Sequence, residues 1–104
     1  MKKSEIFITI LDVVSEHTEI DKEQILSTTR TNDVADARCI AIYYWKKYGL
    51  DTAYLMQRLK RNHHNSIQHL YNQFSSRQQI NRYFRSQCFS IGQELAKIIS
   101  IEGQ

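Results

Sequence analysis

The stretch Arg58-Leu-Lys-Arg-Asn-His-His-Asn-Ser-Ile67 joins two segments of helical periodicity through a short polar turn. Before the turn, Leu55 and Leu59 lie one helical turn apart, and after it an apolar stripe recurs every three or four residues. Two short helices joined by a tight turn predict a helix-turn-helix. This arrangement leaves the first turn of the second helix exposed, where free N–H groups and a positive dipole suit phosphate. The stripe consists of Ile67, Leu70, Tyr71 and Phe74.

Charge is distributed unevenly along the chain. Residues 52–93 contain six Lys or Arg and no Asp or Glu, a net charge of +6, whereas residues 1–51 contain seven against nine, a net charge of −2. A field of one sign over half of a small domain is typical of a protein that binds a polyanion. Without this asymmetry we would favour an ordinary pair of helices with a solvated corner; with it, we favour contact with nucleic acid. The basic residues are Arg58, Lys60, Arg61, Arg77, Arg82 and Arg85.

Composition sets the fold class. A chain of 104 residues is expected to form a single domain over residues 1–104. It contains no proline and three glycines, so the turn residues that sheet-rich folds need are missing. We therefore expect an all-α fold, a small bundle of about six helices that contains the helix-turn-helix and ends in a long C-terminal helix over 76–101. No apolar run approaches a membrane span and no signal cleavage site is visible, which predicts a cytoplasmic protein without a membrane partner.

Capping residues place several helix ends. Asp21 suits an N-cap, and Gln24 follows three residues later as in a capping box. Gly49 suits the left-handed conformation that often follows a helix, and Asp51 can cap the helix after it. The predicted helices span about 4–17, 22–27, 34–48, 52–59, 63–75 and 76–101.

The last predicted helix carries an apolar stripe at spacings of four, four, three, four and three residues. Its basic residues Arg77, Arg82 and Arg85 are candidates for additional phosphate contacts. The stripe is a candidate dimerisation surface that would make the protein a homodimer. We favour the alternative that the stripe packs on the core of its own domain. The stripe consists of Ile80, Phe84, Cys88, Ile91, Leu95 and Ile98.

The sequence predicts no cofactor, no metal and no catalytic site. Cys39 and Cys88 fall within apolar helical patterns, which favours two buried free thiols over a disulfide. His64 and His69 are five residues apart, a poor match for one helical face, and no Asp or Glu lies near them to complete a metal site. No acid–base pair or nucleophile motif is visible, so we do not expect an enzyme.

Aromatic residues cluster at helical spacings around the third predicted helix. Stacking on single-stranded bases is one interpretation of such a cluster. Packing in the core is the interpretation that we favour. The residues are Tyr43, Tyr44, Trp45, Tyr48 and Tyr54.

Three stretches between residues 10 and 70 match a known family in their order and spacing. They are Val14-Ser-Glu-His-Thr-Glu-Ile-Asp-Lys-Glu-Gln-Ile-Leu-Ser27, Arg38-Cys-Ile-Ala-Ile-Tyr-Tyr44 and Arg61-Asn-His-His-Asn-Ser-Ile-Gln-His69. Together they resemble the C-terminal duplex-DNA-binding domain, a helix-turn-helix, of the bacterial chromosomal replication initiator DnaA. The first stretch is similar to the end of the family's first helix and its capped second helix, and the second stretch to its Arg-x-Ile-Ala-x-Tyr helix start. The third stretch is similar to its Gly-Arg-Asp-His-Thr-Thr-Val-x-His signature.

The resemblance implies roles for single residues. His64 matches the family's base-reading His. Asn65 and Ser66 match its paired Thr or Ser residues, which touch bases and phosphate. Arg38 matches an Arg associated with the minor groove, and Arg30 matches a basic residue on the phosphate side of the preceding loop.

The chain also departs from the family. Asn62 stands where the family has Arg and His63 where it has Asp, so the initiator's own box sequence is not expected. The loop 28–37, which is normally rich in Lys and Arg, has Arg30 against two Asp residues and lacks the family's Pro, which leaves its contact with the minor groove open. No GxxxxGK[ST] motif is present, so no nucleotide is expected as a partner.

The sequence therefore predicts a non-enzymatic bacterial protein that binds double-stranded DNA and reads sequence through its fifth helix in the major groove. Replication initiation, mobile-element function and transcription control are all compatible with this prediction. The alternative is a protein-interaction or dimerisation module with an eroded DNA-binding surface, which Asp33, Asp36 and the loss of Asp at position 63 favour. The candidate DNA-binding residues are Arg30, Arg38, Arg58, Lys60, Arg61, Asn62, His63, His64, Asn65, Ser66 and His69.

Overall fold

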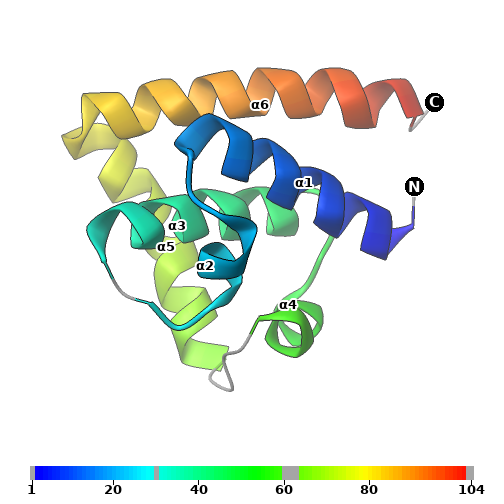
Figure 1. The fold of residues 1–104 in the computed structure, drawn as a ribbon, viewed down its shortest axis with the longest axis horizontal. Helices are drawn as coiled ribbons and strands as arrows, with labels where there is room; N and C mark the ends of the chain where they lie inside the picture. Colours follow the sequence, from blue (N-terminus) through cyan, green and yellow to red (C-terminus); the bar gives the residue numbers. More distant parts are fainter. Residues whose placement is uncertain (1, 30, 60–63, 103–104) are drawn as a thin grey trace.

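The computed structural model describes residues 2–29, 31–59 and 64–102, the side chains of His64, Asn65 and residues 100–102 excepted. Within these residues it contains six helices and no strand, which confirms the prediction of an all-α bundle with a long last helix (Figure 1). Helix α6 crosses one end of the molecule, at the top of Figure 1, and α4 lies near the opposite end. The helices are α1 (Lys3–Thr18), α2 (Lys22–Leu26), α3 (Asn32–Lys47), α4 (Thr52–Arg58), α5 (His64–Ile80) and α6 (Arg82–Glu102).

Helix α3 is the centre of the fold, because α1, α2, α5 and α6 all pack against it. Trp45 of α3 is fully buried; its indole N–H donates to the carbonyl of Phe7 at 3.1 Å, and the two rings stack with centroids 4.4 Å apart. Tyr43 stacks in the same way on Phe74 of α5, with centroids 3.8 Å apart. Aromatic packing therefore joins α3 to its neighbours on two sides, as the core interpretation of this cluster predicted.

Two of the predicted helix ends are confirmed, and the capping box is not. The Asp51 carboxylate accepts a hydrogen bond from the Tyr54 N–H at 2.9 Å and caps α4. Gly49 follows α3 with a φ of 99°, a left-handed conformation that Gly adopts without strain. Asp21 precedes α2, but its side chain makes no capping hydrogen bond; its backbone carbonyl instead accepts from Gln24 at 3.0 Å.

The boundary between the last two helices lies at Asn81, about five residues later than predicted. The Asn81 side chain accepts from the Phe84 N–H at 3.1 Å, which makes Asn81 the N-cap of α6. Arg77 therefore belongs to the end of α5 rather than to the first turn of the last helix. The predicted first member of the apolar stripe, Ile80, is 86% exposed, so the stripe begins only at Phe84.

The apolar stripe of α6 packs on the core of its own domain, as predicted: Phe84, Cys88, Ile91 and Leu95 are all buried. These side chains are therefore covered within the domain. No described helix is long and apolar enough to cross a membrane.

The two cysteines are free and buried, as expected. The Cys39 thiol donates a hydrogen bond to the Leu70 carbonyl of α5, with sulfur and oxygen 3.1 Å apart. Burial raises the pKa of Cys39 and that of Cys88 to about 12 in each case. Both thiols consequently stay protonated at neutral pH and behave as apolar core groups.

Candidate DNA-binding surface

Helices α4 and α5 form the helix-turn-helix pair. Helix α4 ends at Leu59, whose N–H donates to the Leu55 carbonyl at 2.8 Å and whose side chain is buried. Helix α5 begins at His64 and packs on α4. The turn between them, residues 60–63, lies outside the described residues. Because both flanking helices are held by apolar contacts, the start of α5 has a fixed place at one end of the bundle (Figure 1).

The core-facing side of α5 confirms the predicted stripe. Ile67, Leu70 and Phe74 are buried, and Tyr71 is half-buried. The opposite face is polar and carries no Lys, Arg, Asp or Glu before Arg77. The described residues of this outer face are Ser66, Gln68, His69, Asn72, Gln73, Ser75 and Ser76.

Part of the outer face of α5 borders a hollow against the start of α3. Ser66, His69 and Gln73 line it from α5, with Ala35 and Arg38 on the α3 side. His69 is exposed, and Ser66 is half-buried. Hydroxyl, imidazole and amide groups can each donate and accept hydrogen bonds, so this hollow offers several polar contacts beside the outer face.

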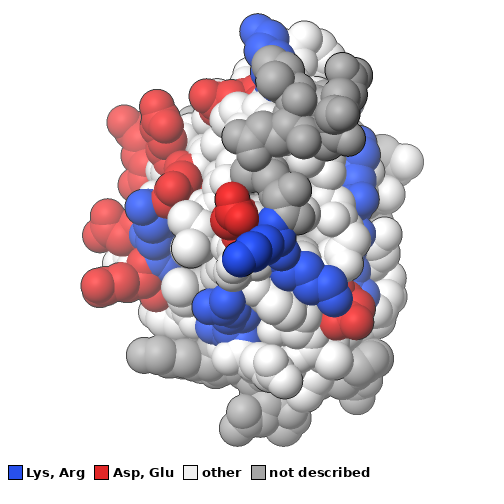
Figure 2. Space-filling view, turned by 90° about the vertical axis from the view of Figure 1, so that its right-hand side faces the viewer, with Lys and Arg blue, Asp and Glu red and all other residues white. Residues whose placement is uncertain are grey.

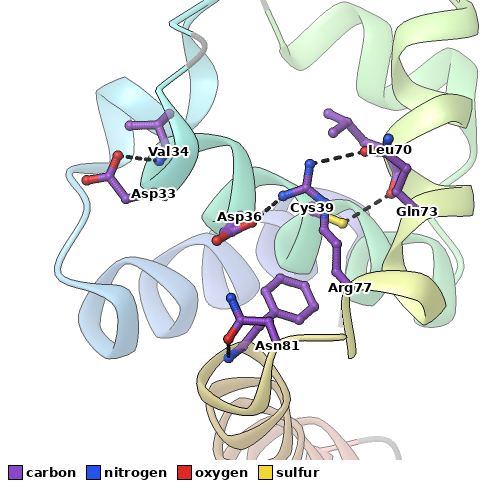
Figure 3. Close-up of polar contacts among 9 residues, drawn as sticks. Asp33, Val34, Asp36, Cys39, Leu70, Gln73, Arg77 and Asn81 are labelled. Carbon is purple, nitrogen blue, oxygen red and sulfur yellow. Dashed lines mark hydrogen bonds and ion pairs between the residues drawn. The ribbon is translucent and has the colours of Figure 1, made fainter. Parts of the chain in front are cut away.

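Arg77 closes the far end of this hollow. Its guanidinium pairs with the Asp36 carboxylate of α3 and donates to the Gln73 side-chain oxygen at 3.1 Å (Figure 3). The pair ties the C-terminal half of α5 to α3. Sequence reasoning assigned Arg77 to the wrong helix and therefore missed this contact, although Asp36 and Arg77 are the opposite charges that the two helices bring together.

Arg38 has a different surrounding from the one that the resemblance implied. Its side chain is only 1% exposed and donates to the carbonyl oxygens of Gln24, Ile25, Ser27 and Thr29 at 2.7–2.9 Å. It therefore provides hydrogen bonds to carbonyl groups at the end of α2 and in the loop that follows, where the helical hydrogen-bond pattern has ended. In this conformation Arg38 holds the loop from the interior, and the minor-groove contact that the resemblance implied stays a prediction. The pattern of the sequence gave no sign that an Arg within an apolar stretch would serve carbonyls.

Arg58 lies exposed at the end of α4. Its guanidinium carbon sits 5.4 Å from the Phe7 ring centroid and 5.3 Å from that of Tyr54. Cation–π contacts of this kind keep the charge at the surface while restricting the side chain.

The other candidate residues fall at the edge of what the structure describes. Arg30 and residues 60–63, which include Lys60, Arg61, Asn62 and His63, lie outside the described residues. His64 and Asn65 belong to the first turn of α5, and their side chains are likewise outside. Among the described residues, no three His, Cys, Asp or Glu side chains group as a metal site requires.

Comparison with protein families gives a match over most of the chain. The family model described as the bacterial DnaA protein helix-turn-helix matches residues 8–73. The match runs from α1 into α5, so the end of α5 and all of α6 lie beyond it. Comparisons with curated proteins and with solved structures return no match. Because the family model covers more than half of the chain, this chain belongs to the bacterial DnaA helix-turn-helix family.

Proposed function

We propose that this protein binds double-stranded DNA without catalysing a reaction, and that α5 enters the major groove to read sequence. Membership of a DNA-binding helix-turn-helix family supports the proposal. The observation that carries it is the outer face of α5, which is polar and uncharged before Arg77 and lies within the stretch 52–93 that has a net charge of +6. A polar helix face within a basic region combines base contacts with phosphate attraction.

The first two turns of α5 are the proposed reading residues. His64, Asn65 and Ser66 stand at the helix start, and His69 follows on the outer face. Asn can bond adenine through two hydrogen bonds, and Ser and His can each donate or accept at base edges. We infer that these side chains determine the DNA sequence that the protein prefers.

Basic residues beside the start of α5 are the proposed phosphate contacts. Lys60 and Arg61 precede the first residue of α5 by four and three positions, and Arg58 is exposed at the end of α4. Contacts of this kind strengthen binding on any sequence and weaken as salt rises, because bound counterions are released. Arg30 is a further candidate in the loop that Arg38 holds by its carbonyls, so Arg38 would act on DNA indirectly.

The alternative function, a protein-interaction module with an eroded DNA surface, is less well supported. It rested partly on the acidic residues Asp33 and Asp36. The Asp36 carboxylate is paired with Arg77, so its charge is offset next to the outer face of α5. Asp33 accepts a hydrogen bond from the Val34 N–H at 2.9 Å at the start of α3 (Figure 3). Both acids thus have local structural partners within the domain.

Titration with a random pool of duplexes, followed by enrichment of the bound fraction, tests the proposal. We expect binding that weakens steeply with salt and enriches a short motif. Arg61→Ala should weaken binding about equally on all duplexes and flatten the salt dependence by about one unit of slope. Lys97→Ala on α6 is the matched control, because it also removes one positive charge and Lys97 is exposed. Absence of binding at low salt would contradict the proposal.

A further inference from the structure

A groove between α3 and α6 shares no residue with the surface proposed to bind DNA through α4 and α5, although Arg85, which borders the groove, was a sequence-based candidate for a phosphate contact. Gly92 and Ala96 line it from α6, and Phe89 beside them is 66% exposed. Two cations, Lys47 of α3 and Arg85 of α6, border the same groove. Among the described residues that line it, none is Asp or Glu. The groove therefore combines an apolar floor with positive charge and suits an acidic segment that carries an apolar side chain.

Packing in the core explains why the floor of the groove has no side chain at Gly92. A Cβ atom on Gly92 would lie 2.5 Å from the Tyr44 hydroxyl oxygen, so no larger residue fits there without displacement. The Tyr44 hydroxyl is itself fixed, because it donates to the Cys88 carbonyl at 2.9 Å. The notch at Gly92 is thus a consequence of the buried tyrosine beneath it.

Helix α1 presents a surface with the complementary properties. Four residues of α1 spaced by three, four and four positions fall on one face of the helix, which is opposite to its buried face, and Glu19 follows directly after the helix end. Ile8 in this row is 53% exposed, although it is a large apolar side chain. Asp12 is paired with Lys22, whereas Glu16 and Glu19 form no ion pair within the described residues. We call this row the α1 acidic stripe: Glu5, Ile8, Asp12, Glu16 and Glu19.

The groove and the α1 acidic stripe lie on different sides of the molecule. Helix α1 turns its buried face toward α3 and α6, so its stripe points away from both. The groove receives no residue from α1. Figure 2 shows Asp and Glu gathered along the left edge of the molecule, with Lys and Arg along the upper part of the opposite edge. The groove and the α1 acidic stripe of a single copy therefore cannot contact each other.

We propose that the α3–α6 groove of one copy binds the α1 acidic stripe of a second copy. Ile8 would rest on the notch at Gly92, and the glutamates of the stripe would face Lys47 and Arg85. Because the two surfaces differ, the contact is head-to-tail. Each assembly keeps a free groove at one end and a free stripe at the other, so further copies can bind and form a linear oligomer. The groove depends on α6, which lies beyond the family match. It does not rest on DNA binding.

Sedimentation equilibrium of the full chain without DNA tests the contact. We expect association that grows with protein concentration at about 50 mM salt and is lost near 1 M, where exposed charges are screened within about 3 Å. Lys97→Glu, which changes the same charge on α6 outside the groove, should associate like the parent protein. A parent protein that stays monomeric at low salt up to millimolar concentration overturns the proposal.

A charge exchange separates this contact from other modes of association. The groove variant Lys47→Glu/Arg85→Glu and the stripe variant Glu16→Lys/Glu19→Lys should each be monomeric, because each places like charges on both surfaces. An equimolar mixture should associate again, since the acidic groove then meets the basic stripe and the acidic stripe meets the unaltered groove. Circular dichroism melting of each variant checks that it is folded. Folded variants that still associate alone, or a mixture that remains monomeric, would overturn the proposal.

Discussion

The two halves of α5 differ in what surrounds them. In the C-terminal half, Phe74 lies in the core against Tyr43, and Arg77 is paired with Asp36. In the N-terminal half, Ile67 is buried, while the exposed His69 has no aromatic or ion-pair partner among the described residues. The C-terminal half is therefore held by these contacts, and the N-terminal half also offers exposed polar side chains. Substitutions of the buried or paired side chains should reduce stability and DNA binding together, and those of the exposed side chains in the N-terminal half should reduce DNA binding alone.

The largest expected effect is at Phe74. Phe74→Ala removes a ring that contacts Tyr43, Tyr44 and Phe84, and should lower the free energy of unfolding by about 3–5 kcal/mol. Urea unfolding measures the loss. His69→Ala is the control on the same helix and should stay within about 0.5 kcal/mol of the parent protein. Similar losses for the two variants would contradict the division of α5.

Arg38→Met should cost about 2–4 kcal/mol of stability, because four carbonyl oxygens lose a charged donor in the interior. Thermal and urea unfolding report the change. DNA binding should fall only as far as the loop between α2 and α3 loses its shape. An unchanged stability combined with lost DNA affinity would instead favour the direct groove contact that the resemblance implied.

The next largest effect is expected at alkaline pH, which should lower the free energy of unfolding through the two buried thiols. Burial raises the pKa of Cys39 and of Cys88 from 9.0 to about 12, so both thiols stay neutral in the folded state while they ionise in the unfolded chain. A raised folded-state pKa means that stability is present below the unfolded pKa and is lost above it. Between pH 9 and 10 the two thiols together should remove about 2 kcal/mol. The double variant Cys39→Ala/Cys88→Ala should show a shallower decline over the same interval, and an equally steep one would exclude the thiols as its source.

The smallest expected effect is at Arg77. Its side chain is 28% exposed and that of Asp36 is 33% exposed, so solvent weakens the ion pair. Arg77→Ala should lower stability by about 0.5–1 kcal/mol, and Asp36→Ala by a similar amount. A double-mutant cycle by urea unfolding isolates the pair. A coupling energy of zero would show that the C-terminal half of α5 is anchored by apolar contacts alone.

The sequence predicted apolar packing better than polar contacts. Local periodicity and backbone preference predict the stripe of α5, that of α6 from Phe84 onward, the cap at Asp51 and the turn at Gly49, and the structure confirms them. The break at Asn81 was missed because Ser75 and Ser76 are equally polar, and only the capping bond to Phe84 distinguishes the true boundary. The role of Arg38 depends on carbonyls 9 to 14 residues away, which no local pattern reveals.

The central claim is that the first turns of α5 read DNA sequence. The most direct measurement compares parent protein, His64→Ala and the surface control Ser86→Ala on the duplex enriched from the random pool and on a scrambled duplex. The account predicts that His64→Ala loses about 1–3 kcal/mol of binding free energy on the enriched duplex and less on the scrambled one, with an unchanged melting temperature. Equal affinities of parent and His64→Ala for the enriched duplex would contradict it.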